Sequence, residues 1–494
     1  MSTDAVVTGA TADGRTVPAV REHAWTIGIN VAMAAWTATL FVLARDSIVT
    51  FRAAGRFDLG NMVQAVWSTT QGRLLENSHG ATGEQMSRLG GHADPFLALL
   101  APLWMLWPSP LSLALAQIVV VALGALPVFW LGRRHLGSDR VAGALALGYL
   151  AYPWVATSAH AAIHPVTFAI PFFLFCIWFL DSGKLVLFGL FALLAMSTGE
   201  LMGLPIAALG IWFALARGRR LAGAVIAVAG LAWTVVAIYV VVRHFSGDES
   251  IFFGFYDHVG GSPQGVLRML FTDPLAVLGA LVEAHDFIYV VWLGLPLLFL
   301  FVLSPGLALV AVPQLLANGL SDFRSMTDPR YHSVAAIVPF LIAATVFGVA
   351  KIGAPRRGLA AAAILVCSVV LSLAVAPWPR LVGATPLGGG PGLPQARVAA
   401  LRDAIAIVPD DAAVSTSNSV GAYLSARRYV YSVPNLGRAT WIVVDRSDPW
   451  VVRPDSPILT RRPKVVRALV RRLEGDRVWT KVFDRDQVAV FRRD

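Results

Sequence analysis

Runs of apolar residues long enough to cross a lipid bilayer recur from Trp25 to Ala376, and this feature restricts the possible folds most strongly. A helix needs about 20 such residues to span the hydrocarbon core. Only 14% of the residues are charged, whereas soluble domains carry roughly 25%. The sequence therefore predicts an all-α polytopic membrane protein with about eleven transmembrane helices. We expect them at 25–44, 111–131, 141–158, 166–180, 185–198, 201–216, 221–242, 287–303, 306–320, 333–350 and 358–376.

The short loops between these segments predict the orientation of the chain. Four of them carry ten Lys and Arg residues against two Asp: 132–140, 181–184, 217–220 and 351–357. Loops rich in Lys and Arg lie in the cytoplasm. We therefore expect a bacterial plasma-membrane protein with a disordered cytoplasmic tail at 1–24, a retained signal anchor and an extracytoplasmic C-terminus. The apolar stretch 96–107 is too short to span comfortably, so we interpret it as an interfacial or re-entrant helix.

The last part of the chain has a different composition. After the membrane domain, 25–376, the stretch 377–394 contains a Gly-rich run typical of a linker. Beyond it, 395–494 predicts a small extracytoplasmic α/β domain, because probable strands alternate with helices. The expected helices are 395–407 and 464–472, and the expected strands are 412–416, 429–432, 441–445, 477–483 and 487–491.

A polar, Gly-rich loop at 45–95 separates the first two apolar segments and contains Asp58 in the sequence Phe-Asp-Leu-Gly. A carboxylate just outside a membrane segment can act as general base on an acceptor hydroxyl. The alternative is that Asp58 caps a helix at 59–69.

The same loop ends with His92-Ala93-Asp94-Pro95. His92 and Asp94 are candidate ligands for a divalent cation such as Mg²⁺, Mn²⁺ or Ca²⁺. The alternative for Asp94 is a helix N-cap followed by Pro at the first helical position, which the Asp-Pro pair fits.

Two further candidates lie between later apolar segments on the expected external side. His164 precedes a proline, and Glu200 interrupts an otherwise continuous apolar stretch. An ionisable group at this depth is costly and commonly lines a cavity or pairs with a charge. We interpret both as candidate substrate-binding residues. The alternative for His164 is a structural role as a hydrogen-bonding interfacial residue.

The loop at 321–332 carries Arg324, Arg330 and His332. An arginine guanidinium binds phosphate through a fork of N–H groups, so these residues are candidates for holding a donor phosphate. The alternative is that the arginines anchor the loop at the membrane surface. The sequence contains no phosphate-binding Gly-x-x-x-x-Gly-Lys motif and no dinucleotide-binding glycine pattern, and we expect no nucleic-acid partner.

Several motifs occur in a recognisable order: Phe-Asp-Leu-Gly at 57–60, Gln-Ala-Val-Trp-Ser at 64–68, His-Ala-Asp-Pro at 92–95 and Ala-Leu-Pro-Val-Phe-Trp-Leu-Gly-Arg-Arg at 125–134. With Glu200 and an Arg-Tyr-His at 330–332, this order resembles an uncharacterised family of bacterial polytopic membrane proteins similar to the glycosyltransferase C (GT-C) superfamily. The resemblance implies a catalytic acidic residue in the first external loop, here Asp58. It also implies inverting transfer from a polyprenyl-phosphate sugar donor.

From these features we expect a membrane glycosyltransferase that moves a sugar from a polyprenyl-phosphate donor to a cell-envelope glycan, glycolipid or protein on the external face. The alternative class is a transporter or flippase for a lipid-linked saccharide, which would also need a groove and phosphate-binding arginines. Internal repeats would favour transport, and the sequence contains none that we can identify.

Overall fold

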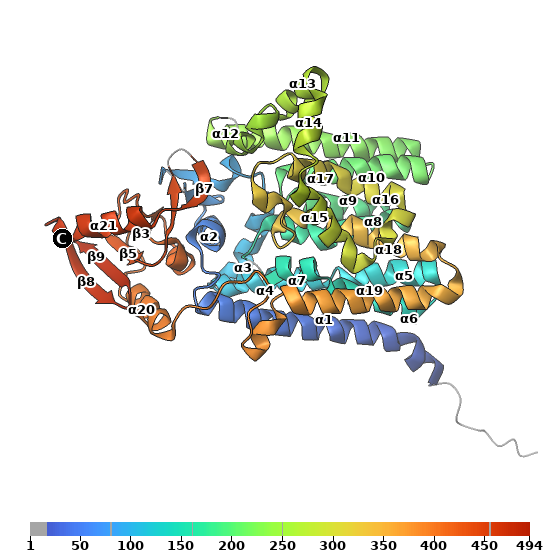
Figure 1. The fold of residues 1–494 in the computed structure, drawn as a ribbon, viewed down its shortest axis with the longest axis horizontal. Helices are drawn as coiled ribbons and strands as arrows, with labels where there is room; N and C mark the ends of the chain where they lie inside the picture. The colour runs from blue at the N-terminus through green and yellow to red at the C-terminus, as the bar shows by residue number, and fades with distance from the viewer. Residues whose placement is uncertain (1–16, 80–81, 161, 249, 454–455) are drawn as a thin grey trace, which may run out of the picture.

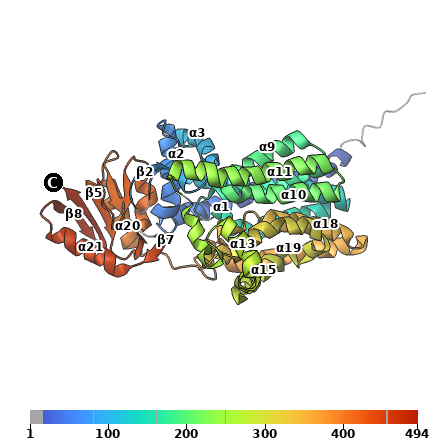
Figure 2. The same cartoon turned by 90° about the horizontal axis from the view of Figure 1, so that it is seen from above.

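The computed structural model describes residues 17–79, 82–160, 162–248, 250–453 and 456–494. Most of them are helical, and the helices form an elongated bundle with a strand-containing part at one end (Figure 1). Figure 2 shows the same arrangement from a second direction. The bundle helices are α1 (Val17–Val49), α4 (Pro110–Ala122), α5 (Ala125–Leu136), α6 (Asp139–Ala151), α7 (Pro153–His160), α8 (Ala169–Asp181), α9 (Leu185–Met196), α10 (Gly203–Ala216), α11 (Arg220–Val236), α12 (Arg243–Ser246), α13 (Pro263–Thr272), α14 (Pro274–Ala280), α15 (Ala284–Gly294), α16 (Pro305–Ala308), α17 (Val312–Gly319), α18 (Val338–Lys351) and α19 (Ala354–Val375).

Four helical segments in the described part of the chain are long and apolar enough to cross a membrane: Ala24–Val49, Pro110–Leu136, Arg220–Ser246 and Ala354–Val375. A fifth is added if α14 and the segment that follows it, bent by 56°, count as one span. The remaining apolar helices have 10–17 residues, including Pro95–Leu106. The protein is thus a helical membrane protein, and the number of eleven spans stays a prediction. The segment Pro95–Leu106 is as short as its sequence indicated.

Small residues let two of the bundle helices approach closely. α10 and α11 meet through Gly203 and Gly210 on one helix and Gly223 and Gly230 on the other. A Cβ atom at Gly230 would collide with the backbone carbonyl oxygen of Gly203. Close backbone contact through glycine is the usual way for helices to associate in lipid, where hydrophobic exclusion does not drive them together.

The basic loops gather at one end of the bundle. Asp181, at the end of α8, forms ion pairs with Arg134 and Arg217 and a polar contact with His135. It therefore joins three of these loops. The ring of His135 lies 4.5 Å from that of Phe347, near the end of α18. Figure 1 shows the turn between α18 and α19, the fourth basic loop, at the end opposite the C-terminal part. The basic loops and the C-terminal part therefore occupy opposite ends of the protein, and their orientation across the membrane stays a prediction.

The C-terminal part is a layered α/β unit. Its sheet has the strand order β4-β3-β5-β9-β8, from β3 (Val414–Thr416), β4 (Val430–Ser432), β5 (Trp441–Asp445), β8 (Trp479–Arg485) and β9 (Val488–Arg493). Strands β4, β3 and β5 are parallel, whereas β9 is antiparallel to both β5 and β8. Side chains alternate along β5: Ile442 and Val444 pack with α21 (Pro463–Gly475), and Val443 belongs to the core that contains α20 (Gln395–Ala406). Alternation of this kind follows from the period of two in a strand.

The five expected strands and both expected helices of this unit are confirmed, with ends that agree within three residues. The sequence did not predict the hairpin of β6 (Trp450–Arg453) and β7 (Ser456–Arg461).

The loop 45–95 has a fold of its own. After α1, a π-helical turn at Arg56–Gly60 leads into α2 (Asn61–Thr70). A short hairpin of β1 (Glu76–Ser78) and β2 (Gln85–Ser87) follows, then a 3₁₀ turn at Arg88–Gly90 and the helical pair Pro95–Leu100 and α3 (Ala101–Leu106). The capping alternative for Asp58 is wrong, because α2 begins after Gly60 and its first turn has no side-chain cap.

Candidate functional site

Seven polar side chains from four separate stretches of the chain lie near one another where the bundle meets the C-terminal unit. We call them the histidine–carboxylate cluster: Asp58, Arg88, His92, Asp94, His164, Glu200 and His332. All but Arg88 are candidates named from the sequence. The structure therefore brings together residues that are up to about 270 positions apart in the chain.

Two histidines form the centre of the cluster. The rings of His164 and His332 are stacked, with centroids 3.8 Å apart and an interplanar angle of 15°. Burial lowers the pKa of His164, with Asp58 opposing this shift and Arg88 and His92 adding to it. Burial also lowers the pKa of His332 well below its usual range, with further contributions from His164, His92 and Arg88. Both imidazoles are therefore neutral at pH 7.

Buried amide side chains hold the two histidines in place. Gln117 on α4 accepts a hydrogen bond from the backbone N–H of His164 at 2.9 Å, and its amide donates to the carbonyls of Ser158 and Ala159. Asn318 on α17 donates to the backbone carbonyl of Ser333, next to His332, at 3.2 Å. Both amides are fully buried, and a buried polar group keeps its place because its hydrogen bonds are costly to lose.

A second pair lies at the edge of the cluster. His92 Nδ1 lies 3.2 Å from Glu200 Oε1, and the backbone N–H of Ala93 donates to Glu200 Oε2 at 3.2 Å. The imidazole of His92 stacks on Phe252, with centroids 4.3 Å apart. The indole N–H of Trp233 donates to the carbonyl of Gly199, which fixes the backbone beside Glu200. The carboxylate of Glu200 is thus held by two neighbouring residues of the loop 45–95, and α11 fixes the backbone beside it.

The third pair joins Arg88 to Asp94. The guanidinium donates from Nε at 2.9 Å and from Nη2 at 2.7 Å to the same oxygen, Asp94 Oδ2. Burial raises the pKa of Asp94, while the charge of Arg88 opposes the increase. The other oxygen, Oδ1, is buried and has no hydrogen-bond partner among the described residues. Asp94 occupies the N-cap position that its sequence indicated, without a side-chain cap bond.

Asp58 is the exposed member of the cluster. It lies in the π-helical turn Arg56–Gly60, and its charge is close enough to act on His164. Two residues before it, Arg56 is fully buried although it has no carboxylate partner among its described contacts. Arg56 donates instead to Gln64 Oε1 at 2.9 Å and to the carbonyls of Ser78 at 3.2 Å and Val430 at 3.1 Å.

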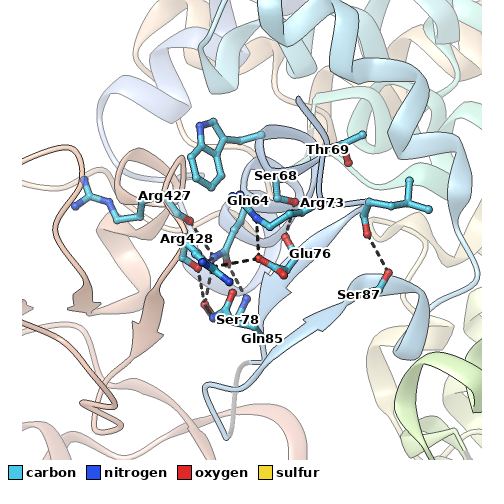
Figure 3. A network of polar contacts seen from close by, with 12 residues as sticks. Gln64, Ser68, Thr69, Arg73, Glu76, Ser78, Gln85, Ser87, Arg427 and Arg428 are labelled. Atoms are coloured by element: carbon cyan, nitrogen blue, oxygen red, sulfur yellow. Dashed lines mark hydrogen bonds and ion pairs between the residues drawn. The ribbon is translucent and has the colours of Figure 1, made fainter. Parts of the chain in front are cut away.

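Gln64 extends this contact with the C-terminal unit. Its amide donates to the carbonyls of Arg427 at 3.1 Å and Arg428 at 2.9 Å, and to the hydroxyl of Ser78 at 3.1 Å. Figure 3 shows Gln64, Ser78 and Gln85 beside the chain at Arg427 and Arg428. We call these bonds, with those of Arg56, the loop clamp.

Two backbone contacts complete the junction next to Asp58. The N–H of Phe57 donates to Asn418 Oδ1 at 3.0 Å, and the N–H of Ala422 donates to the carbonyl of Ala54 at 3.0 Å. Gly421 lies so close to Arg56 that a Cβ atom there would overlap the arginine side chain. The turn that carries Asp58 is therefore packed directly against the C-terminal unit.

The two arginines predicted for phosphate binding have other neighbours. Arg330 pairs with Asp328 and donates to the carbonyl of Gly388 in the linker at 3.3 Å. Arg324 lies close enough to Asp286 for its charge to act on that carboxylate. Of the loop 321–332, the structure places His332 in the cluster, and the role of the arginines stays a prediction.

The expected divalent cation stays a prediction. In the structure His92 pairs with Glu200, and Asp94 pairs with Arg88. Within the described residues, no group of three or more His, Cys, Asp or Glu side chains is placed to hold an ion. We therefore assign no step to a metal.

Sequence reasoning missed Arg88, Gln117 and Asn318. Gln117 and Asn318 did carry a signal, because each is an amide within an apolar segment, Gln117 alone and Asn318 four residues after Gln314. Arg88 is one of several basic residues in a polar loop, and only the fold distinguishes it.

The two buried histidines predict a pH effect on stability. An unfolded histidine has a pKa of about 6.5, and the lowered native pKa values mean that only the unfolded chain takes up these protons just below that pH. We expect the free energy of unfolding to fall below pH 6.5 by up to about 1.4 kcal/mol per pH unit for each histidine. Thermal unfolding in detergent between pH 7.5 and 5.5 measures this.

A His164→Gln, His332→Gln double variant should flatten this dependence, whereas His258→Gln, at an exposed position, should keep the native slope. If the double variant keeps the native dependence of stability on pH, the two histidines do not cause it.

Comparisons with known proteins complete the description. The model of a family described as "Predicted membrane protein (DUF2079)" matches residues 51–490. No curated protein matches the sequence. The crystal structure of ArnT from Cupriavidus metallidurans bound to undecaprenyl phosphate is similar with a TM-score of 0.50 and 12% identity, over 94% of this chain and 98% of that chain. Its apo form gives a TM-score of 0.48 and 13% identity, over 93% and 98%. The first similarity concerns the fold and agrees with the GT-C-like fold expected from the sequence.

Proposed function

The chain belongs to the DUF2079 family of predicted membrane proteins, and we propose that it is a glycosyltransferase of the GT-C type. It would transfer a sugar from a polyprenyl-phosphate donor to a cell-envelope glycan, glycolipid or protein on the external face of the plasma membrane. The ArnT structure that shares its fold was crystallised with undecaprenyl phosphate, which supports a donor of that lipid class.

One observation carries the proposal: the exposed carboxylate of Asp58 is close enough for its charge to act on His164, whose ring stacks on His332, and the cation Arg88 acts on both histidines. Glycosyl transfer needs a base for the acceptor hydroxyl and a positive environment for the departing phosphate. The cluster offers both at the end of an apolar bundle.

In the proposed step, Asp58 accepts the proton of the acceptor hydroxyl. The acceptor oxygen forms a bond to the anomeric carbon while the bond from that carbon to the phosphate oxygen breaks. The electron pair leaves with the polyprenyl phosphate, and attack opposite the leaving group inverts the anomeric centre. Asp58 ends protonated and returns its proton to solvent, to which it is exposed.

Arg88 and His332 are the proposed phosphate ligands. Arg88 binds Asp94 through Nε and Nη2, so the guanidinium is oriented and retains further N–H donors. A neutral His332 can donate one N–H to a phosphate oxygen. Arg324 and Arg330 remain candidates for binding the same phosphate as the donor enters.

Glu200 and His92 are proposed to bind hydroxyl groups of the donor sugar, together with His164. Glu200 keeps one face toward His92 and the Ala93 amide, and a carboxylate has acceptor capacity for further hydroxyls. Asp94 is proposed to orient Arg88 and not to touch the sugar.

The test is transfer of radiolabelled sugar from polyprenyl-phosphate pools in membranes that contain the wild-type protein, compared with membranes that lack it. We expect label in an envelope acceptor only when the protein is present. If label instead crosses the bilayer while still attached to its lipid, and no acceptor is labelled, the protein is a flippase and the proposal is wrong.

A further inference from the structure

A cleft of about 530 Å³ lies at the C-terminal end of α2, whereas Asp58 precedes its N-terminal end, and three parts of the chain share the cleft. The loop 45–95 contributes Trp67 and Gln71, α3 contributes Trp104, and the C-terminal unit contributes Asp410, Tyr423 and Arg427. Its size lies within the range of about 300–1,000 Å³ typical of small-molecule sites. None of these residues belongs to the histidine–carboxylate cluster.

Aromatic side chains make up much of the cleft. Trp104 is almost completely buried and forms the floor, whereas Trp67 and Tyr423 are partly exposed. Each exposed ring is held in place: the guanidinium of Arg73 lies 5.3 Å from the centroid of Trp67, and Phe51 lies 5.4 Å from Tyr423. An aromatic face carries negative charge density, so it attracts the C–H bonds on the face of a sugar ring.

An exposed carboxylate in the cleft can bind hydroxyl groups. Arg427 is buried and donates through Nη1 to the carbonyls of Pro409 and Ala412, at 2.9 and 3.0 Å. These bonds fix the turn that carries the exposed Asp410. Of the described residues that line the cleft, Arg427 is the only basic one, and its Nη1 is bonded to these two carbonyls. The carboxylate of Asp410 is exposed and can accept hydrogen bonds from hydroxyl groups.

The surroundings place the cleft at a membrane surface. Met105, another lining residue, is 70% exposed, and its neighbour Leu106 on α3 is 85% exposed. Apolar side chains this exposed at the end of a membrane helix indicate contact with lipid. A ligand in the cleft would therefore have its sugar beside the aromatic rings and its chains in the bilayer.

We propose that this cleft binds the saccharide headgroup of a membrane glycolipid. Helix α2 has ten residues and is about 15 Å long, so the cleft and Asp58 lie at opposite ends of it. A lipid-linked acceptor of more than one sugar could occupy the cleft and still reach Asp58. The link to an acceptor rests on the proposed function, whereas binding itself does not require transfer.

The test is photo-cross-linking of the full-length protein in phosphatidylcholine nanodiscs. The probes are diacylglycerols that carry glucose, galactose or mannose with a diazirine on the sugar, and a diazirine-labelled diacylglycerol without sugar. We expect at least one sugar probe to label 61–73, 101–108 or 409–427. Asp410→Asn should weaken this labelling about tenfold, the effect of losing a hydrogen bond to a charged acceptor.

Asp411→Asn is the matched control, because Asp411 is the exposed neighbour of Asp410, acts on Arg427 in the same way and does not line the cleft. It should label as the wild type does. Equal labelling by the sugar-free probe, equal effects of the two Asn variants, or labelling outside these peptides would overturn the proposal. Asp58→Asn should bind the probe normally. If the wild type binds the probe normally but transfers no sugar, the proposed transferase activity is wrong, whereas the proposed glycolipid site in the cleft stands.

Discussion

Replacement of Asp58 by Asn is expected to reduce sugar transfer by about 10²–10⁴-fold, the usual contribution of a general base. Asparagine has nearly the same shape but cannot accept the acceptor proton. Asp58 is exposed, so the loss should not unfold the protein. Initial rates of transfer from polyprenyl-phosphate-linked radiolabelled sugar, at equal protein amounts, measure the effect.

The matched control is Asp46→Asn. Asp46 is an exposed carboxylate at the end of α1 that pairs with Arg52 on the same side of the bundle. Its replacement should leave the rate within about twofold, because exposed ion pairs contribute little. A correctly folded Asp58→Asn protein with the wild-type rate would remove Asp58 from the mechanism.

The second large effect is expected from Arg56→Met. The variant keeps much of the side-chain volume but leaves the carbonyls of Ser78 and Val430 buried without this donor. Each unsatisfied buried group costs about 1–3 kcal/mol. Part of this loss is offset, because the variant no longer has to remove a charged guanidinium from water when it folds. We expect a loss of about 2–4 kcal/mol in the free energy of unfolding of the junction, and a large fall in transfer because Asp58 shares the same turn.

A protease site inserted in the exposed linker between Gly388 and Gly392 provides the measurement. After cleavage, the C-terminal fragment should remain bound in the wild type and separate in Arg56→Met. Arg428→Met is the control at the same junction, because Arg428 is half-exposed and its ion pair with Glu76 is long, at 3.9 Å; its fragment should stay bound. If the Arg56→Met fragment also stays bound, the loop clamp does not hold the two parts together.

Much of the fold could be predicted because its signals are local. Apolar segments, the strands of the C-terminal unit and both of its helices follow from periodicity and turn residues that lie within a few positions of one another. The number of membrane spans could not be predicted from the sequence, because several apolar segments are short or broken by proline and glycine. Their fit to a bilayer depends on packing against neighbours.

The candidate site was predictable where a residue is chemically out of place in its surroundings. Glu200 in an apolar stretch and His164 between two spans are such cases. The loop clamp could not be predicted, because Arg56 and Gln64 are ordinary polar loop residues in the sequence. Only the fold places Val430 and Arg428 beside them. Likewise Arg330 looked free in the sequence, whereas Asp328, two positions away, binds it in the fold.

The loop clamp also sets the time at which the proposed transferase could first become active. Arg56 and Val430, which it joins, are 374 positions apart, so a ribosome adding about 5–20 residues per second needs roughly 20–75 s to make the second after the first. During that interval most of the membrane helices are made, while the turn with Asp58 has no partner to complete it. In the proposed function and orientation, transfer could therefore begin only after the end of translation and export of the last hundred or so residues, and we expect a chain truncated before them to be inactive.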